Sequence, residues 1–151
     1  MSKPLRQITK YLEGQGAKPE FDLDSHTLFL DSTTDSGDVQ TRYFYDLDME
    51  VLSSQSIFTE PFAKQRYGAM CELINRFNAQ LGFGAFVLLD EEDLVFEINY
   101  LLDKDAVISP AILEKLSLIP AEAMAEHLPA FIAVGMRGED PEEVFDRFCE
   151  E

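Results

Sequence analysis

The chain has 151 residues, of which 46% are hydrophobic, and we expect them to form a single domain with a buried core, spanning residues 1–151. Asp and Glu outnumber Lys and Arg by 29 to 12, which gives a formal net charge of -17. Such a chain repels nucleic-acid backbones and anionic membranes, because both bind through cationic side chains. The first residues lack the apolar core of a signal segment, so the sequence predicts a cytoplasmic protein that binds neither nucleic acid nor membrane.

The first half of the chain predicts a helix followed by strands. Apolar residues recur at helical spacing over residues 5–12, and Gly14 ends this helix. Beyond it, apolar and polar residues alternate with the period that is typical of strands. Strands are expected at residues 21–24, 26–31, 42–51 and 51–58. The clearest is 42–51, and the turn-forming stretch 33–38 predicts that it pairs with 26–31 as an antiparallel hairpin.

The second half predicts a core helix, a hairpin and two further helices. Pro61 opens the helix that we expect at the centre of the core, and Gly82 stops it. The later elements are a hairpin with strands 86–89 and 94–102 around an acidic turn, a helix from Ser109 to Met136 that is broken or kinked at Pro120 and Pro129, and a last helix capped by Asp140. The order of elements predicts an α+β fold, with an antiparallel sheet packed against helices.

No arrangement of residues predicts catalysis. A nucleophilic Ser or Cys needs a base beside it, and the chain has two histidines, His26 and His127, neither of which lies in a catalytic signature. We expect structural or surface roles for both. Cys71 is expected to be a small buried hydrophobe, and Cys149 an unreactive thiol near acidic residues. The sequence therefore assigns no catalytic residue and no cofactor, and we expect a protein without enzymatic activity, with an uncharacterised hydrolase as an open alternative.

Two acidic clusters offer oxygen atoms to a hard cation. They are Asp46-x-Asp48-x-Glu50 and the turn at residues 90–93. An EF-hand that started at Asp46 would need Gly and Glu where the chain has Val51 and Ile57. A solvated acidic surface is therefore favoured and no metal site is assigned, but a calcium-binding protein stays open as a second alternative.

Three stretches of the sequence carry a resemblance to a known family. They are residues 73–90, the strand Val-Phe-Glu-Ile-Asn-Tyr that begins at Val95, and residues 127–144. Together they resemble the YbjN-like proteins, which are described as bacterial sensory transduction regulators and share their fold with type III secretion chaperones. The resemblance implies a secretion-chaperone-like α+β domain that often self-associates, and it supplies no catalytic residue.

The remaining expectation concerns a protein-docking surface. One face of the predicted sheet mixes apolar residues with acids, and an exposed face of that kind is typical of a docking site. The candidate partner-binding residues are Phe29 and Phe44 on the first hairpin, Val95 and Leu101 on the second, and Phe131 and Val134 on the kinked helix. The last four are also the candidates for the contact of a homodimer. The sequence thus predicts a non-catalytic protein-interaction or regulatory module, chaperone-like in its fold, with an unidentified protein partner.

Overall fold

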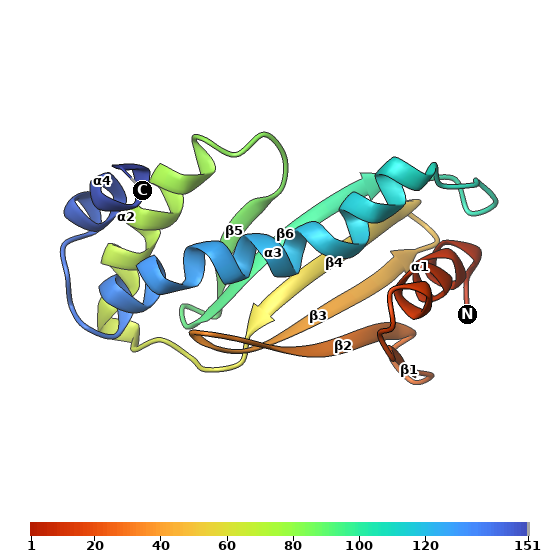
Figure 1. Ribbon diagram of the computed structural model, residues 1–151, viewed down its shortest axis with the longest axis horizontal. Helices are drawn as coiled ribbons and strands as arrows, with labels where there is room; N and C mark the ends of the chain where they lie inside the picture. Colours follow the sequence, from red (N-terminus) through yellow and green to blue (C-terminus); the bar gives the residue numbers. More distant parts are fainter. Residues whose placement is uncertain (151) are drawn as a thin grey trace.

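Six strands form one antiparallel sheet, in the order β1-β2-β3-β4-β6-β5 (Figure 1). The computed structural model describes residues 1–150. Its elements are α1 (Lys3–Gly14), β1 (Glu20–Asp22), β2 (Thr27–Thr34), β3 (Gly37–Asp46), β4 (Val51–Phe58), a 3-10 turn η1 (Lys64–Arg66), α2 (Tyr67–Asn78), β5 (Ala85–Leu89), β6 (Asp93–Leu101), α3 (Pro110–Gly135) and α4 (Pro141–Glu150). The predicted α+β class, with an antiparallel sheet and helices, is confirmed.

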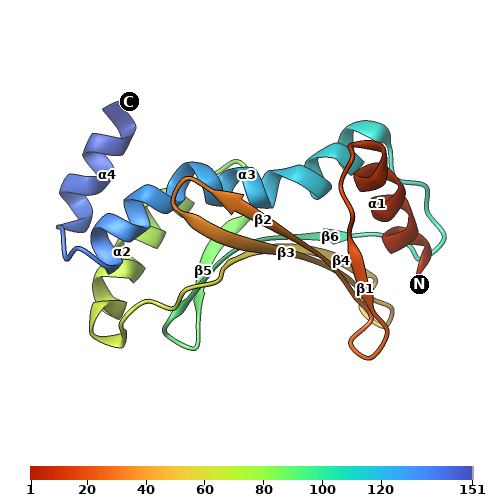
Figure 2. The same cartoon turned by 60° about the horizontal axis from the view of Figure 1, so that its bottom comes forward.

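Helices cover one face of the sheet. Helices α1 and α3 lie on the same side, and α3 runs along the sheet, whereas α2 and α4 lie together beyond the β5 side (Figures 1 and 2). Among the described elements, no helix covers the opposite face of β2, β3 and β4, which we call the open face. The prediction that the helix from Pro61 is the central core helix was wrong, because α3 takes that place and α2 begins only at Tyr67. Helix α3 is apolar around much of its circumference, and such a helix must be buried.

Both predicted hairpins are confirmed. Strands β2 and β3 pair from Leu28↔Tyr43 to Thr34↔Gly37, so the turn lies within the stretch 33–38 that the sequence marked. Strands β5 and β6 pair from Ala85↔Glu97 to Leu89↔Asp93 around the acidic turn. The weaker strand that was expected at residues 51–58 is also present, as β4.

The prediction of a strand over residues 42–51 was wrong at its C-terminal end. Strand β3 stops at Asp46, and residues 47–50 form the turn into β4. The Asp46 carboxylate accepts hydrogen bonds from the backbone N–H groups of Asp48 and Met49, both at 3.0 Å. Glu50 then adopts φ +55°. A short acidic side chain that bonds the backbone two and three residues later favours a turn over a strand.

Polar side chains of the sheet replace a hydrogen bond that α3 lacks. Pro120 has no N–H, so the carbonyl of Leu116, one helical turn earlier, has no helical donor. The Ser54 hydroxyl of β4 donates to that carbonyl at 2.7 Å, and the Tyr43 hydroxyl of β3 donates to the carbonyl of Ser117 at 2.6 Å. Burial raises the pKa of Tyr43, which keeps this hydroxyl protonated as a donor. The helix therefore continues through the proline as one element of 26 residues.

Candidate interaction surface

Val95, which was expected on an exposed face, is fully buried. Its side chain is 0% exposed although it points to the open face. It lies in the register between Ile57 of β4 and Val87 of β5, so an apolar neighbour flanks it on each side. The segment after β4 is also held near this hairpin, because the Phe62 N–H donates to the Glu92 carbonyl at 2.8 Å. Val95 therefore stabilises the hairpin and is not available to a partner.

The two candidates on α3 are buried as well. Phe131 and Val134 are both 0% exposed. The Phe131 ring lies 5.4 Å from the ring of Phe77 and 5.0 Å from that of Phe86, measured between centroids. They face inward because this part of α3 packs against the sheet and against α2. The expectation that they form a pairing surface was wrong on this point.

Phe29 and Phe44 do lie on the open face, where both are half-buried. Polar side chains form hydrogen bonds on this face, one within β3 and two between β4 and β6. The bonds run from Arg42 Nε to Gln40 Oε1 at 2.7 Å, from Gln55 Nε2 to Glu97 Oε2 at 3.1 Å and from Ser53 Oγ to Asn99 Oδ1 at 2.7 Å. Phe29 and Phe44 are diagonal neighbours on β2 and β3, and the polar bridges between β4 and β6 separate them from Leu101, so they form no continuous apolar patch with the other predicted residues.

Leu101 is the candidate that the structure places at an open edge. Its residue is 79% exposed at the end of β6. Strand β6 has nine residues and β5 has five, and their pairing stops at Ala85↔Glu97. Beyond that pair, no strand in residues 1–150 lies beside β6 on the β5 side. We call residues 98–101 the β6 edge.

The backbone of the β6 edge offers unpaired groups to a partner strand. The N–H of Leu102 faces β4, since it donates to the Glu50 carbonyl at 2.9 Å. Successive residues of an antiparallel strand turn their N–H and C=O groups to opposite sides. The N–H and C=O groups of Asn99 and Leu101 therefore face the side of β6 on which β5 lies earlier in the strand, beyond the point where β5 ends. They are the groups that an added strand would bind.

An apolar hollow lies beside the β6 edge, on the α3 side of the sheet. Its volume is about 360 Å³, and we call it the edge groove. It is lined by Phe83, Gly84, Ile98, Asn99, Tyr100, Ile112, Lys115 and Leu116. Lys115 is the one charged residue among these lining residues. The groove combines exposed apolar surface with an adjacent strand edge, which is the chemistry that peptide-binding edges use.

Gly84 and Asn78 explain why β6 is open while β5 is not. Gly84 has φ +78°, and a Cβ there would lie 2.6 Å from the Phe96 ring, so the chain bends out of the sheet at a position that only glycine fits. Asn78 of α2 blocks the outer edge of β5. Its Nδ2 donates to the Phe86 carbonyl at 3.0 Å, and its Oδ1 accepts from the Phe86 N–H at 2.8 Å. The outward backbone groups of β5 are therefore occupied at Phe86, whereas those at the end of β6 are open.

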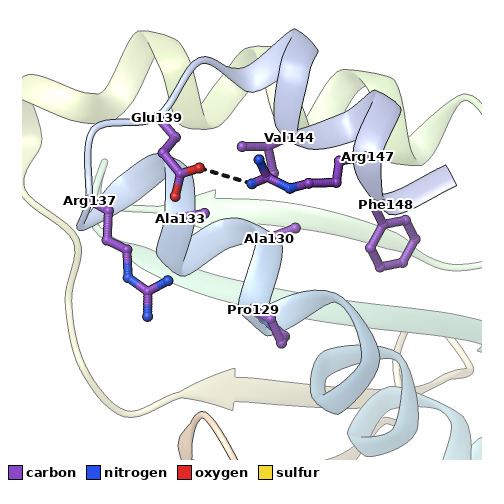
Figure 3. Close-up of a pocket in the computed structure, with 8 residues that line it drawn as sticks. All are labelled: Pro129, Ala130, Ala133, Arg137, Glu139, Val144, Arg147 and Phe148. Carbon is purple, nitrogen blue, oxygen red and sulfur yellow. Dashed lines mark hydrogen bonds and ion pairs between the residues drawn. The ribbon is translucent and has the colours of Figure 1, made fainter. Parts of the chain in front are cut away.

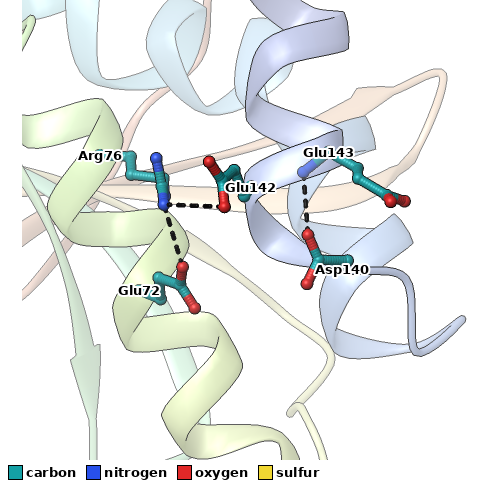
Figure 4. A network of polar contacts seen from close by, with 5 residues as sticks. All are labelled: Glu72, Arg76, Asp140, Glu142 and Glu143. Atoms are coloured by element: carbon teal, nitrogen blue, oxygen red, sulfur yellow. Dashed lines mark hydrogen bonds and ion pairs between the residues drawn. The ribbon is translucent and has the colours of Figure 1, made fainter.

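A second hollow, of about 210 Å³, lies between α3 and α4 (Figure 3). An ion pair between Arg147 and Glu139, 2.9 Å long, crosses from α4 to the loop before it. Nearby, Arg76 of α2 contacts Glu72 at 3.2 Å and Glu142 of α4 at 3.7 Å (Figure 4). These pairs are solvent-exposed, so each contributes about 0–1 kcal/mol. The pairs of Arg76 with Glu142 and of Arg147 with Glu139 join α4 to α2 and to the preceding loop, and we assign them this structural role.

The start of α4 and the aromatic cluster beneath it confirm two further expectations. The Asp140 carboxylate caps α4 by accepting the Glu143 N–H at 3.1 Å (Figure 4). His127 is 8% exposed, and its ring lies 4.7 Å from the Phe77 ring and 4.9 Å from the Phe148 ring, between centroids. Its Nδ1 lies 2.8 Å from the Ala123 carbonyl oxygen, one turn earlier. His127 is thus a packed core residue, which agrees with the structural or surface role that was expected for it.

The other histidine and the two cysteines are not fully buried. His26 and Cys149 are exposed, and Cys71 is half-buried rather than fully buried as was expected. Within residues 1–150, no group of three or more His, Cys, Asp or Glu residues is arranged to hold a metal ion. In the same part of the chain, no helix combines the length and the apolar character that crossing a membrane requires.

Sequence reasoning missed Phe83, Ile112 and the open backbone of Asn99. A signal for the open edge was present, because the predicted strands at residues 86–89 and 94–102 differ in length by about a factor of two. Two strands joined by a tight turn can pair only over the shorter one, so the end of the longer strand had to lack a partner on that side. No pattern in the sequence placed Phe83 or Ile112 beside it, since these residues come from a loop and from a helix.

Comparison with known proteins agrees with the fold and with the resemblance in the sequence. A family model, YbjN, described as "Putative bacterial sensory transduction regulator", matches residues 4–132. That match reaches from α1 through most of α3, and it includes the whole sheet. A search of curated proteins returned no match to this chain. Because the family model covers well over half of the sequence, the chain belongs to the YbjN family.

Proposed function

We propose that this protein is a non-catalytic regulatory module that acts by binding a protein partner at the β6 edge and the edge groove. The family description supports a regulatory role. The observation that carries the proposal is the uncovered strand edge, which has the uncharged sequence Ile-Asn-Tyr-Leu in a chain of net charge -17. Proteins usually protect such edges with charges, proline or a covering element. An edge left without that protection beside an apolar groove favours a binding role.

A pair of variants tests this proposal. Leu101 and Leu23 are 79% and 74% exposed, so Leu101→Lys and Leu23→Lys add the same charge at similarly exposed sites. Leu23 lies in the turn between β1 and β2, at the other side of the sheet. Affinity capture from the source cell, quantified by mass spectrometry, should retain partners with the wild type and with Leu23→Lys and lose them with Leu101→Lys, because a lysine on a strand edge opposes strand addition. Equal retention by both variants would contradict the proposal.

A calcium site, the main alternative, makes a distinct prediction. We expect millimolar calcium to leave the thermal midpoint nearly unchanged, because the acidic turn at residues 90–93 is solvated and holds no metal cluster in the described chain. Binding to the folded state alone would stabilise it by about 2.7 kcal/mol at a hundredfold excess of calcium over Kd. Thermal denaturation followed by circular dichroism measures the shift. A rise of several degrees that vanishes in Asp90→Asn with Asp93→Asn would instead support the calcium alternative.

A cytoplasmic location, a chaperone-like role and the pairing of two copies remain predictions from the sequence. Of the residues named for a homodimer contact, Leu101 is the exposed one, so a dimer would have to use the β6 edge. Light scattering across protein concentrations checks this prediction, and Leu101→Glu should then dissociate the dimer.

A further inference from the structure

We propose that the β6 edge binds an extended segment of a different protein as an additional antiparallel strand, and that this segment alternates apolar and basic residues. The inference rests on the proposed function and names the chemistry of the partner. It follows from three properties of the site: the direction of the free backbone groups, the faces on which neighbouring side chains lie, and the sign of the charge around them.

The free backbone groups require an extended partner. Asn99 and Leu101 each turn an N–H and a C=O toward the uncovered side. A helix has no free backbone groups along its length to pair with them, whereas a strand presents such groups on every second residue. All the strand pairs of this sheet are antiparallel, so an antiparallel strand continues the existing pattern.

The side chains at the edge give the partner two different faces. Residues directly opposite one another in an antiparallel pair have their side chains on the same face. A partner residue opposite Tyr100 therefore points into the edge groove, which is lined by apolar groups and by Lys115. A partner residue opposite Asn99 points to the open face. The groove side thus requires apolar residues, since a cation there would meet Lys115 in an apolar surrounding.

The charge of the protein makes the open-face positions basic. Glu97 lies on the open face of β6, next but one to Asn99, where a basic partner side chain can reach it. The net charge of -17 also attracts a cationic segment and repels a second copy of this chain. The opposite end of the sheet differs, because Glu20, Asp22 and Asp31 lie along β1 and β2. The β6 edge itself is uncharged, so Glu97 and the net charge of the protein supply the attraction for a basic strand, and the edge groove supplies the apolar contact.

The probe for this proposal is a fluorescein-labelled nonapeptide with blocked ends in which Val and Lys alternate, beginning with Val. Fluorescence anisotropy should show saturable binding. A peptide with Ser in place of Val should bind at least about tenfold more weakly, because it cannot fill the groove. Equal binding of the two peptides would show that charge alone attracts them, and would overturn the proposal.

Backbone methylation separates strand addition from other modes of docking. With Val in the groove, the amides of the Lys residues face Asn99 and Leu101, and those of the Val residues face solvent. N-methylation of the central Lys amides should therefore weaken binding at least about tenfold, and N-methylation of the central Val amides should leave it within about threefold. An equal loss with both peptides, or the reverse order, would overturn the antiparallel register.

Two substitutions at one position make the matched test on the protein. Leu101→Pro removes an N–H that no strand of this sheet uses, whereas Leu101→Ala keeps the N–H and removes most of the side chain. Circular dichroism verifies folding of both. We expect the proline variant to bind the Val-Lys peptide at least about tenfold more weakly than the alanine variant. Equal affinities would overturn backbone pairing.

The outcomes also separate this inference from the proposed function. If Leu101→Lys loses captured partners while the wild type fails to bind the Val-Lys peptide, the site binds proteins but not by this chemistry, and the inference alone is overturned. A dimer that occupies the β6 edge and dissociates on Leu101→Glu would likewise overturn it in favour of a second copy. If Leu101→Lys and Leu23→Lys retain partners equally, the proposed function is contradicted, and the inference that rests on it is contradicted with it.

Discussion

Phe131→Ala is expected to lower the free energy of unfolding by about 3–5 kcal/mol, the usual cost of removing a buried phenylalanine ring. The ring is 0% exposed and lies between those of Phe77 and Phe86, so its removal leaves a cavity at the point where α2, α3 and β5 meet. Aromatic pairs of this kind add about 0.5–1.5 kcal/mol beyond the buried area. Urea denaturation followed by circular dichroism measures the change.

The same substitution at Phe83 is the control. Phe83 is 48% exposed in the loop before β5, so Phe83→Ala should change the free energy of unfolding by about 0.5 kcal/mol or less. Because Phe83 lines the edge groove, this variant should still bind the Val-Lys peptide more weakly than the wild type. A cost below about 1 kcal/mol for Phe131→Ala would show that the aromatic cluster is not packed as described.

Ser54→Ala is expected to cost about 1–3 kcal/mol, because it leaves the buried Leu116 carbonyl without a donor. The effect should depend on Pro120. In Pro120→Ala, residue 120 regains its N–H, which can donate to Leu116 as in an ordinary helix. The cost of Ser54→Ala should therefore shrink by at least about 1 kcal/mol in that background. Urea denaturation of the two single variants and the double variant gives this coupling energy.

Ser53→Ala is the control for the double-mutant comparison of Ser54→Ala with Pro120→Ala. Ser53 is the neighbour of Ser54 on β4, but its hydroxyl donates to Asn99 on the open face, away from α3. Its effect on stability should be independent of Pro120, within about 0.5 kcal/mol. If Ser54→Ala costs the same with proline and with alanine at position 120, the hydroxyl does not replace the missing helical bond.

Strands were predicted well where every second residue is buried. They were predicted poorly where a turn has the same alternation of apolar and polar residues. In β6, Leu94, Phe96 and Ile98 are buried against the helices, as period two requires. Leu47 and Met49 continue the same period beyond β3, yet both are exposed in the turn that Asp46 organises. Periodicity detects which residues share a face, but not whether the chain remains extended.

The layer order could be predicted only in part. Helix α2 has a clear apolar stripe, with Met70, Leu73 and Phe77 buried, and this made it appear to be the core helix. Helix α3 lacks a single stripe because its sides contact the sheet, α1, α2 and α4. An apolar surface around the whole helix is the stronger sign of central burial. The two internal prolines obscured that sign, because they suggested a broken element.

The candidate site, too, could be predicted only in part. Leu101 could be assigned to an exposed position because the longer strand of the hairpin extends beyond its partner. Val95 lies on the same face of the same strand, but Ile57 and Val87 flank it there. Those neighbours depend on the register with β4 and β5, and the sequence predicted only one of these two pairings. Burial on an open sheet face is a property of neighbouring strands, which one strand cannot reveal.

The shortness of the β6 edge would determine how long the proposed partner stays bound. The edge begins where the chain bends away at Gly84 and ends at Leu101, so a guest strand gains only about four backbone hydrogen bonds, each worth about 0.5–1.5 kcal/mol net. Such a contact dissociates readily, and residence times should fall toward the millisecond end of the range for protein complexes. Occupancy then follows the free concentration of the partner from moment to moment. The geometry suits a reporter of changing partner levels better than a store that retains its cargo.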